Sequence, residues 1–250
     1  MNARELTNYL NAYLRIGDVQ DYQGAFNGQQ VEGSPVVTRV AMAVDACQFT
    51  IDAAVTARAD LLIVHHGLFW GPVAPVTERY YHRLSALIKN GIGLYSCHLP
   101  LDAHPEVGNN HVLARMLGLK PNGVFGAFEG VPIGVYADAA MSREALVDRV
   151  REALQVEPLV IATGPAELKR IGVLTGGGGS LIAEAAAAGL DMYITGEGAH
   201  HTYFEAEERG LNVIYAGHYA TETVGVKALG EHLKAQFGLE VQFIDHPTGL

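Results

Sequence analysis

Two adjacent histidines, His65 and His66, end an apolar run in the sequence LLIVHHGLFW. Leu61 to Val64 has the length and branched side chains of a buried strand, and Gly67 interrupts the pattern just after the pair. Neutral imidazole is a common ligand for zinc, iron and similar ions, so the pair is a candidate half of a metal site. Side chains alternate along a regular strand, so both can serve one site only if the backbone turns there or the site holds two centres. The alternative is one core histidine and one solvated histidine, because a metal site needs more than two ligands.

Further candidate ligands come later in the chain. His218 and Glu222 are four residues apart at the start of the last predicted helix, which puts both side chains on one helical face. Asp102 follows another strand, in a segment that Pro100 keeps from being a regular helix. Three imidazoles and two carboxylates suit a two-metal centre, because one carboxylate can bridge two ions and open positions remain for water. Taken singly, Glu222 could be an exposed helix residue and Asp102 a turn former.

Other polar residues follow the same strand ends. His98 could be a ligand, a proton carrier, a group that orients a ligand through its other nitrogen, or a plain core histidine. Glu197 follows the strand that corresponds to the histidine strand, so we expect it to face the same cleft. His98 and Glu197 are therefore the candidate catalytic residues for moving protons. His200 and His201 begin a predicted helix, where adjacent side chains cannot both point inward, so we expect one of them in solvent.

The segment Thr175 to Ser180, TGGGGS, joins a predicted strand to a predicted helix. Its backbone N–H groups could cradle an anion. No lysine precedes Ser180, so the segment is not a P-loop, and it lacks the spacing of a dinucleotide site. A tight turn that needs positive φ is the slightly better interpretation. The phosphate site is a hypothesis that replacement of Gly178 would test.

Composition excludes several classes of protein. The 250 residues are 49% hydrophobic, enough for a substantial core. The formal net charge of -10 opposes a nucleic-acid surface, which needs clustered Lys and Arg. Cys47 and Cys97 have no CxxC spacing, Met1 to Leu14 is too polar for a signal peptide, and no run of about 18 apolar residues suggests a membrane span. We therefore expect a protein of the reducing cytoplasm, without nucleic-acid or membrane partners.

Strands and helices alternate throughout, which predicts an α/β fold with largely parallel sheets. Two segments of equal length, Arg39 to Asp60 and Arg170 to Asp191, each contain a predicted strand, then a predicted helix, and end at an aspartate. The spacing between histidine and carboxylate also matches, because His98 precedes Asp102 by as many residues as His218 precedes Glu222. We therefore expect two pseudo-repeated halves, 1–120 and 121–250, packed around a central metal-binding cleft. The predicted helices are 3–16, 49–59, 80–90, 110–117, 142–154, 181–188, 200–209 and 220–237, and the predicted strands are 36–44, 61–64, 92–97, 125–136, 158–161, 169–174, 192–195, 212–215 and 241–244.

Four segments carry a resemblance to a known family. LLIVHHG, CHLPLD, YITGE with the histidines after it, and AGHYATE resemble the signature segments of the Nif-three-like, or YbgI-like, dinuclear metal centre family, often described as GTP cyclohydrolase type 2 homologues. The similarity covers nearly the whole chain in the same order. This chain has Gly-Leu-Phe-Trp after the histidine pair, where many relatives have a proline next to the pair. The resemblance implies a ring-shaped homohexamer and two divalent metal ions per chain, held by His65, His66, Asp102, His218 and Glu222.

Two ions that share Glu222 could lower the pKa of a bridging water and present hydroxide to an electrophilic carbon or phosphorus. This chemistry predicts a metal-dependent hydrolase of a small, nucleotide or phosphorylated, substrate. The resemblance implies opening of the imidazole ring of GTP, although no guanine-specific motif is visible. The ligand types allow zinc, iron, manganese or nickel. The alternatives are a non-catalytic metal-binding ring or scaffold protein, and a nucleotide-binding regulator that uses the TGGGGS segment.

Overall fold

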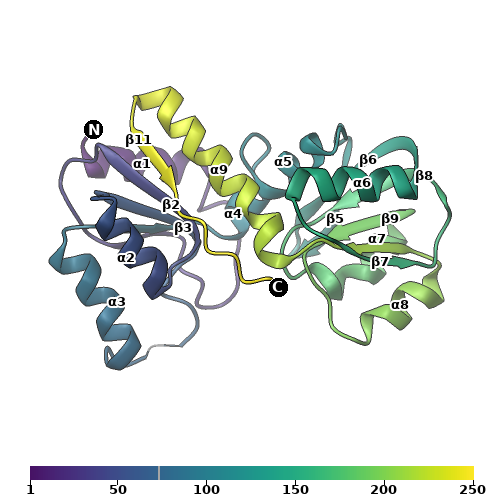
Figure 1. Cartoon of the computed structure of the whole chain (residues 1–250), viewed down its shortest axis with the longest axis horizontal. Helices are drawn as coiled ribbons and strands as arrows, with labels where there is room; N and C mark the ends of the chain where they lie inside the picture. Colours follow the sequence, from purple (N-terminus) through teal and green to yellow (C-terminus); the bar gives the residue numbers. More distant parts are fainter. Residues whose placement is uncertain (73) are drawn as a thin grey trace. The chain divides into compact units, whose positions relative to one another are not determined.

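The chain folds into two compact α/β units (Figure 1). The structure is a computed structural model that describes residues 1–72 and 74–250. The first unit consists of Met1–Leu101 and Val226–His246, and the second of Asp102–Gly225 and Pro247–Leu250. These units differ from two consecutive halves, because the chain returns to the first unit after Gly225 and because 102–120 belongs to the second. Asp102 is therefore the first residue of the second unit.

A sheet with the strand order β1-β4-β3-β2-β11 forms the centre of the first unit. β4, β3, β2 and β11 are parallel neighbours, as predicted, whereas β1 pairs antiparallel with β4. β1 lies between the predicted helix 3–16 and the predicted strand 36–44, where no strand is predicted, and it forms as a short edge strand because β4 offers it a partner. The elements are α1 (Ala3–Tyr13), β1 (Gly28–Val31), β2 (Arg39–Asp45), α2 (Gln48–Thr56), β3 (Leu61–His66), α3 (Glu78–Lys89), β4 (Gly93–Ser96), the later part of α9 (His218–Phe237) and β11 (Glu240–Phe243).

Helices cover both faces of the first sheet (Figure 1). Ala41 of β2 packs in one core cluster with residues of α2 and α3. Met42 points to the other face, where it packs close to α9. A Cβ added to Gly230 of α9 would lie 3.1 Å from Cγ of Met42. On that same face the hydroxyl of Tyr95 donates to Asn11 of α1 at 3.0 Å. Because both faces are covered, the strands read as continuous apolar runs rather than alternating ones.

The second unit is built on a sheet with the order β5-β6-β8-β9-β10-β7. Within it β8, β9 and β10 run parallel, whereas β5 and β6 form a hairpin and β7 pairs antiparallel with β10. The sheet is therefore mixed. The elements are α4 (Leu99–Ala103), which crosses the boundary between the units, α5 (Asn109–Met116), β5 (Gly123–Phe128), β6 (Val131–Ser142), α6 (Arg143–Leu154), β7 (Leu159–Ala162), β8 (Glu167–Val173), the 3-10 helix η1 (Gly178–Leu181), α7 (Ile182–Ala187), β9 (Met192–Thr195), α8 (Thr202–Arg209), β10 (Asn212–Tyr215) and the start of α9.

The second sheet is also covered on both faces. Met192 and Ile194 of β9 pack with residues of α5, α6 and the start of α9. Tyr193, between them, packs with residues of α7 and α8. Two cores on opposite faces make each unit a layered α/β structure, which confirms the predicted fold class.

The predicted repeat is visible in the hydrogen bonds of the two units. A carboxylate oxygen of Asp60 accepts from the N–H of Arg39 at 2.9 Å, and one of Asp191 accepts from the N–H of Arg170 at 3.0 Å. Both aspartates follow a crossover helix and tie its end to the backbone of the preceding strand. The arrangements β2-α2-β3-α3-β4 and β8-α7-β9-α8-β10 are thus equivalent.

The predicted match between His98 in one half and His218 in the other is off by one residue in the structure. The N–H of Cys97 donates to the carbonyl of Val64, and the N–H of Ala216 donates to the carbonyl of Thr195, which is the equivalent position. His98 therefore corresponds to Gly217 and not to His218. The matching spacing between histidine and carboxylate in the two halves is not a structural equivalence.

Within the described residues, the helices lack the combination of length and apolar character that a membrane span requires.

Candidate metal centre

β3 carries the histidine pair to the carboxyl end of the first sheet. Both residues belong to the strand, and their ring centroids lie 4.6 Å apart. His65 is fully buried, and its Nδ1 lies 2.9 Å from the carbonyl oxygen of Cys97, just after β4. His66 is partly exposed, and its Nδ1 lies 2.9 Å from Oδ1 of Asp45, at the end of β2. The two rings therefore lean toward opposite neighbouring strands but remain side by side.

His98 completes a group of imidazoles in the first unit. Its ring centroid lies 4.9 Å from that of His65 and 5.5 Å from that of His66, and one possible ligand atom of each ring lies within 4.8 Å of the others. The Nδ1 of His98 faces Oδ1 of Asp21 at 2.8 Å. A carbonyl or carboxylate oxygen accepts a hydrogen bond from Nδ1–H, so each neutral ring presents the lone pair of Nε2. These are the tautomers that metal coordination through Nε2 requires.

Asp21 holds His98 from a distant loop. Its other carboxylate oxygen accepts from the Asn27 side chain at 2.8 Å and from the N–H of Leu99 at 3.1 Å. Burial alone would raise the pKa of Asp21, but the hydrogen bond and charge of His98, with the bonds from Asn27 and the Tyr22 N–H, lower that pKa below its usual value. The carboxylate therefore stays ionised and fixes the imidazole.

The turn after the histidine pair depends on Gly67. The side-chain oxygen of Gln30 accepts from the N–H of Leu68 at 2.8 Å and of Phe69 at 3.2 Å. A Cβ on Gly67 would lie 2.3 Å from Nε2 of Gln30. The Gly-Leu-Phe-Trp continuation is thus held from β1, and a larger residue at position 67 would have to displace the side-chain amide of Gln30.

The second unit gathers Asp102, His218 and Glu222. Possible ligand oxygens of Asp102 and Glu222 lie within 4.8 Å of one another, although the two side chains are only 6% and 3% exposed. Asp102 accepts from the neutral side chains of Asn109 at 2.8 Å and Thr175 at 3.2 Å. Two buried carboxylates at this separation are stabilised by positive charge.

His218 supplies positive charge to this group. Its Nε2 lies 3.2 Å from Oε1 of Glu222, and its Nδ1 lies 2.8 Å from Oε1 of Glu197. The hydrogen bond to Glu222 raises the pKa of His218 to about 9, against the effect of burial and with further help from Glu197. The ring is therefore an imidazolium at neutral pH, and a metal ion at Nε2 would have to displace a proton.

The glycine-rich segment lies against the same carboxylate. Gly176 has a φ of +70°, and a Cβ there would lie 2.2 Å from Oε1 of Glu222. Glycine is thus required by the backbone conformation and by the space beside Glu222. The N–H groups of Thr175, Gly176, Gly178 and Gly179 donate to acceptors within the second unit. This use of the N–H groups favours the tight turn over an anion cradle.

Among the described residues, His200 and His201 belong to neither ligand group. Both are exposed, in the turn before α8. The ring of His200 meets Phe204 edge-on at 5.6 Å, and His201 lines a hollow that Glu197 also lines.

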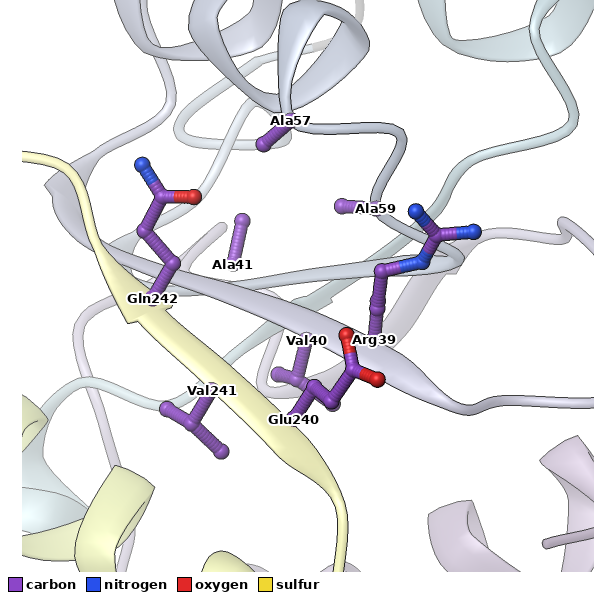
Figure 2. Close-up of a pocket in the computed structure, with 8 residues that line it drawn as sticks. All are labelled: Arg39, Val40, Ala41, Ala57, Ala59, Glu240, Val241 and Gln242. Atoms are coloured by element: carbon purple, nitrogen blue, oxygen red, sulfur yellow. The ribbon is translucent and has the colours of Figure 1, made fainter.

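A separate hollow lies beside the β2–β11 pair (Figure 2). Arg39 and Glu240 are cross-strand neighbours there, and Figure 2 shows their side chains next to one another. Ala57 and Ala59 form the opposite wall. The lining contains none of the predicted site residues.

Sequence reasoning missed the side chains that orient the predicted ligands. Asp45 could have been predicted from the sequence, because it follows the predicted strand 36–44 just as the histidine pair follows the predicted strand 61–64. Thr175 had the same signal, because it follows the predicted strand 169–174. Asp21 and Asn109 had none, because they reach the site from segments that no local pattern connects to it.

Comparison with known proteins identifies the family of the chain. The Duf34/NIF3 (NGG1p interacting factor 3) family model matches residues 1–249. A Deinococcus radiodurans protein named GTP cyclohydrolase 1 type 2 homolog is 43% identical over 248 residues, which cover 98% of this chain and 94% of that protein. Two solved structures cover 100% of both chains: protein ybgI, with a TM-score of 0.93 and 40% identity, and TTHA1606 from Thermus thermophilus, with a TM-score of 0.91 and 45% identity. The chain therefore belongs to the Duf34/NIF3 family.

Proposed function

We propose that the chain binds two divalent metal ions and uses them to hydrolyse a small molecule. The observation that carries this proposal is the pair of buried carboxylates, Asp102 and Glu222, within 4.8 Å of one another and beside His218. Divalent cations would offset their charge. The imidazole group of the first unit offers neutral nitrogen ligands, and family membership supports combining the two groups. The proposed ligands are His65, His66, Asp102, His218 and Glu222.

The donor set fits such ions. Imidazole nitrogen and carboxylate oxygen together suit zinc, iron, manganese and nickel. The oxygen atoms of Cys97, Asp45 and Glu197 hold the Nδ1 atoms of the proposed histidine ligands, which fixes each ring and raises its basicity. When bound, the ions would supply Lewis acidity and a water activated near neutral pH.

Two residues of the chain have proposed roles in moving or holding protons. His98 lies beside the histidine pair with its Nδ1 against Asp21, so its Nε2 can exchange a proton while the carboxylate stabilises the charged ring. Glu197 holds the Nδ1 proton of His218 and keeps Nε2 directed at Glu222, and it is the second candidate for proton transfer.

Nucleotides are the first substrates to test, because several relatives are named GTP cyclohydrolase 1 type 2 homolog. That name would imply opening of the imidazole ring of GTP. We also propose a homohexamer in the cytoplasm, from the resemblance and from the composition. Light scattering during size-exclusion chromatography would then give about six times the 26.8 kDa of one chain.

Turnover and metal content test the proposal together. We would measure bound metals by elemental analysis and then incubate the loaded protein with a panel of nucleotides and phosphoesters. Glu222→Gln should lose metal and turnover, whereas Glu208→Gln, at an exposed position on α8, should retain both.

The other outcomes separate the alternatives. Full metal occupancy without turnover of any substrate would favour a non-catalytic metal-binding ring. Nucleotide binding that survives a chelator would favour a nucleotide-binding regulator. Protein that neither contains nor takes up a transition metal would overturn the proposal.

A further inference from the structure

A pair of exposed aromatic side chains flanks the imidazole group of the first unit. Tyr22 is 48% exposed and Trp70 is 44% exposed, with ring centroids 6.2 Å apart. The ring of His98 lies 4.7 Å from that of Trp70 and 5.7 Å from that of Tyr22. Trp70 also meets His66 edge-on at 6.0 Å. Large aromatic side chains are stabilised by burial, so a half-exposed pair at this place is a surface suited to a ligand.

The two loops that carry these rings are fixed to each other through their backbones. The N–H of Gly71 donates to the carbonyl of Gly24 at 3.2 Å, and the N–H of Phe26 donates to the carbonyl of Phe69 at 3.3 Å. Gly24 has a φ of +91°, and a Cβ there would lie 2.7 Å from the Cα of Gly71. Backbone contact this close sets the spacing of the aromatic pair. Asp21, next to Tyr22 in the chain, also holds Nδ1 of His98.

We propose that Tyr22 and Trp70 form a stacking platform for a planar heteroaromatic ring of the substrate. This inference rests on the proposed function and names its substrate class. The electron-rich faces of Tyr and Trp stack well on electron-poor heteroaromatic rings such as nucleobases. The segments 21–27 and 67–72 contain no Lys or Arg, so the platform recognises the ring and not a phosphate group.

Trp70 is the only tryptophan of the chain, so its fluorescence reports directly on the platform. The full chain, first without metal and then loaded, would be titrated with guanosine and adenosine. We expect saturable quenching by both nucleosides and none by ribose 5-phosphate, which lacks the ring. Tyr22→Leu keeps the reporter and apolar bulk but should weaken nucleoside binding by about fivefold or more, because base stacking on one ring typically contributes at least that factor.

Matched variants keep the inference falsifiable. Trp70→Phe, followed by calorimetry, should also bind the nucleosides more weakly, whereas Tyr81→Leu should not, because Tyr81 is 50% exposed on α3 and outside the platform. A lack of saturable quenching up to about 10 mM, ten times a dissociation constant of about 1 mM, would overturn the inference. Equal quenching by tetramethylammonium would also overturn it, because it would show recognition of a cation. Metal content and turnover are read separately, so a failure of ring binding is distinguishable from a failure of the proposed hydrolase.

Discussion

Nδ1 of His66 and Oδ1 of Asp45 lie 2.9 Å apart, and the two residues are direct partners in the parallel ladder of β3 and β2. The backbone register of the sheet therefore sets this contact. A histidine held in this way presents Nε2 in a fixed direction and binds metal more strongly.

Asp45→Asn should weaken metal binding by about 10- to 100-fold, because the amide is a poorer acceptor for the Nδ1 proton of His66. Titration against a competing chelator would measure the change. Asp52→Asn is the matched control, since Asp52 is exposed on α2 and its carboxylate accepts locally from Gln48 in the first turn. Equal affinities in both variants would contradict the role of Asp45.

Gly176→Ala should displace Glu222, because the added Cβ would lie 2.2 Å from its Oε1. We expect loss of metal from the second ligand group and a fall in thermal stability. Gly189→Ala has a similar positive φ of +72°, but its nearest neighbour would be 3.9 Å away. The control should share the cost of about 1–2 kcal/mol for a Cβ-bearing residue in the left-handed region, and it should keep its metal. Metal retained in Gly176→Ala would show that Glu222 can move without loss of the site.

His98→Gln should keep both metal ions but lose about 10²- to 10⁴-fold in turnover, as expected for removal of a proton carrier. Elemental analysis and the pH profile of turnover would be measured on the same sample. If one ion per chain disappears instead, His98 is a ligand and its proposed role is wrong.

Asp60 should stabilise the fold in a pH-dependent way. Burial raises its pKa, but the hydrogen bonds from Arg39 and Thr38 outweigh burial and lower the pKa below its ordinary value of 3.8. The ionised form therefore contributes stability above about pH 4, and this contribution is lost as pH falls through the lowered pKa. Asp60→Asn should cost about 1–2 kcal/mol in urea unfolding at pH 7 and less at pH 3. A pH-independent difference would refute this account.

Removal of metal should lower the melting temperature. An ion that binds only the folded state stabilises it by about 2.7 kcal/mol at a hundred times its dissociation constant. Scanning calorimetry with zinc or manganese, and then with a chelator, would show the shift. The shift should be much smaller in Glu222→Gln, and an undiminished shift would place the ions elsewhere.

Most of the layered architecture could be predicted from local patterns. Apolar runs followed by Asp, Gly, His or Thr marked β2, β3, β8, β9 and β10, and the repeated Asp60 and Asp191 marked the two equivalent arrangements. β1 was missed because a four-residue edge strand is stabilised by pairing with β4 and has little pattern of its own. The division into discontinuous units was also missed, because α9 reads as one continuous helix from His218 to Phe237.

The sequence by itself determined which residues could serve as ligands, because residue type, helical spacing and position after a strand are local properties. Only the tertiary structure decided how these residues are held. Asp21 meets His98 across 77 residues of chain, and Gly176 leaves space for Glu222 from a different element. Such contacts depend on strand order, register and backbone approach, and these arise only when segments distant in the chain pack together.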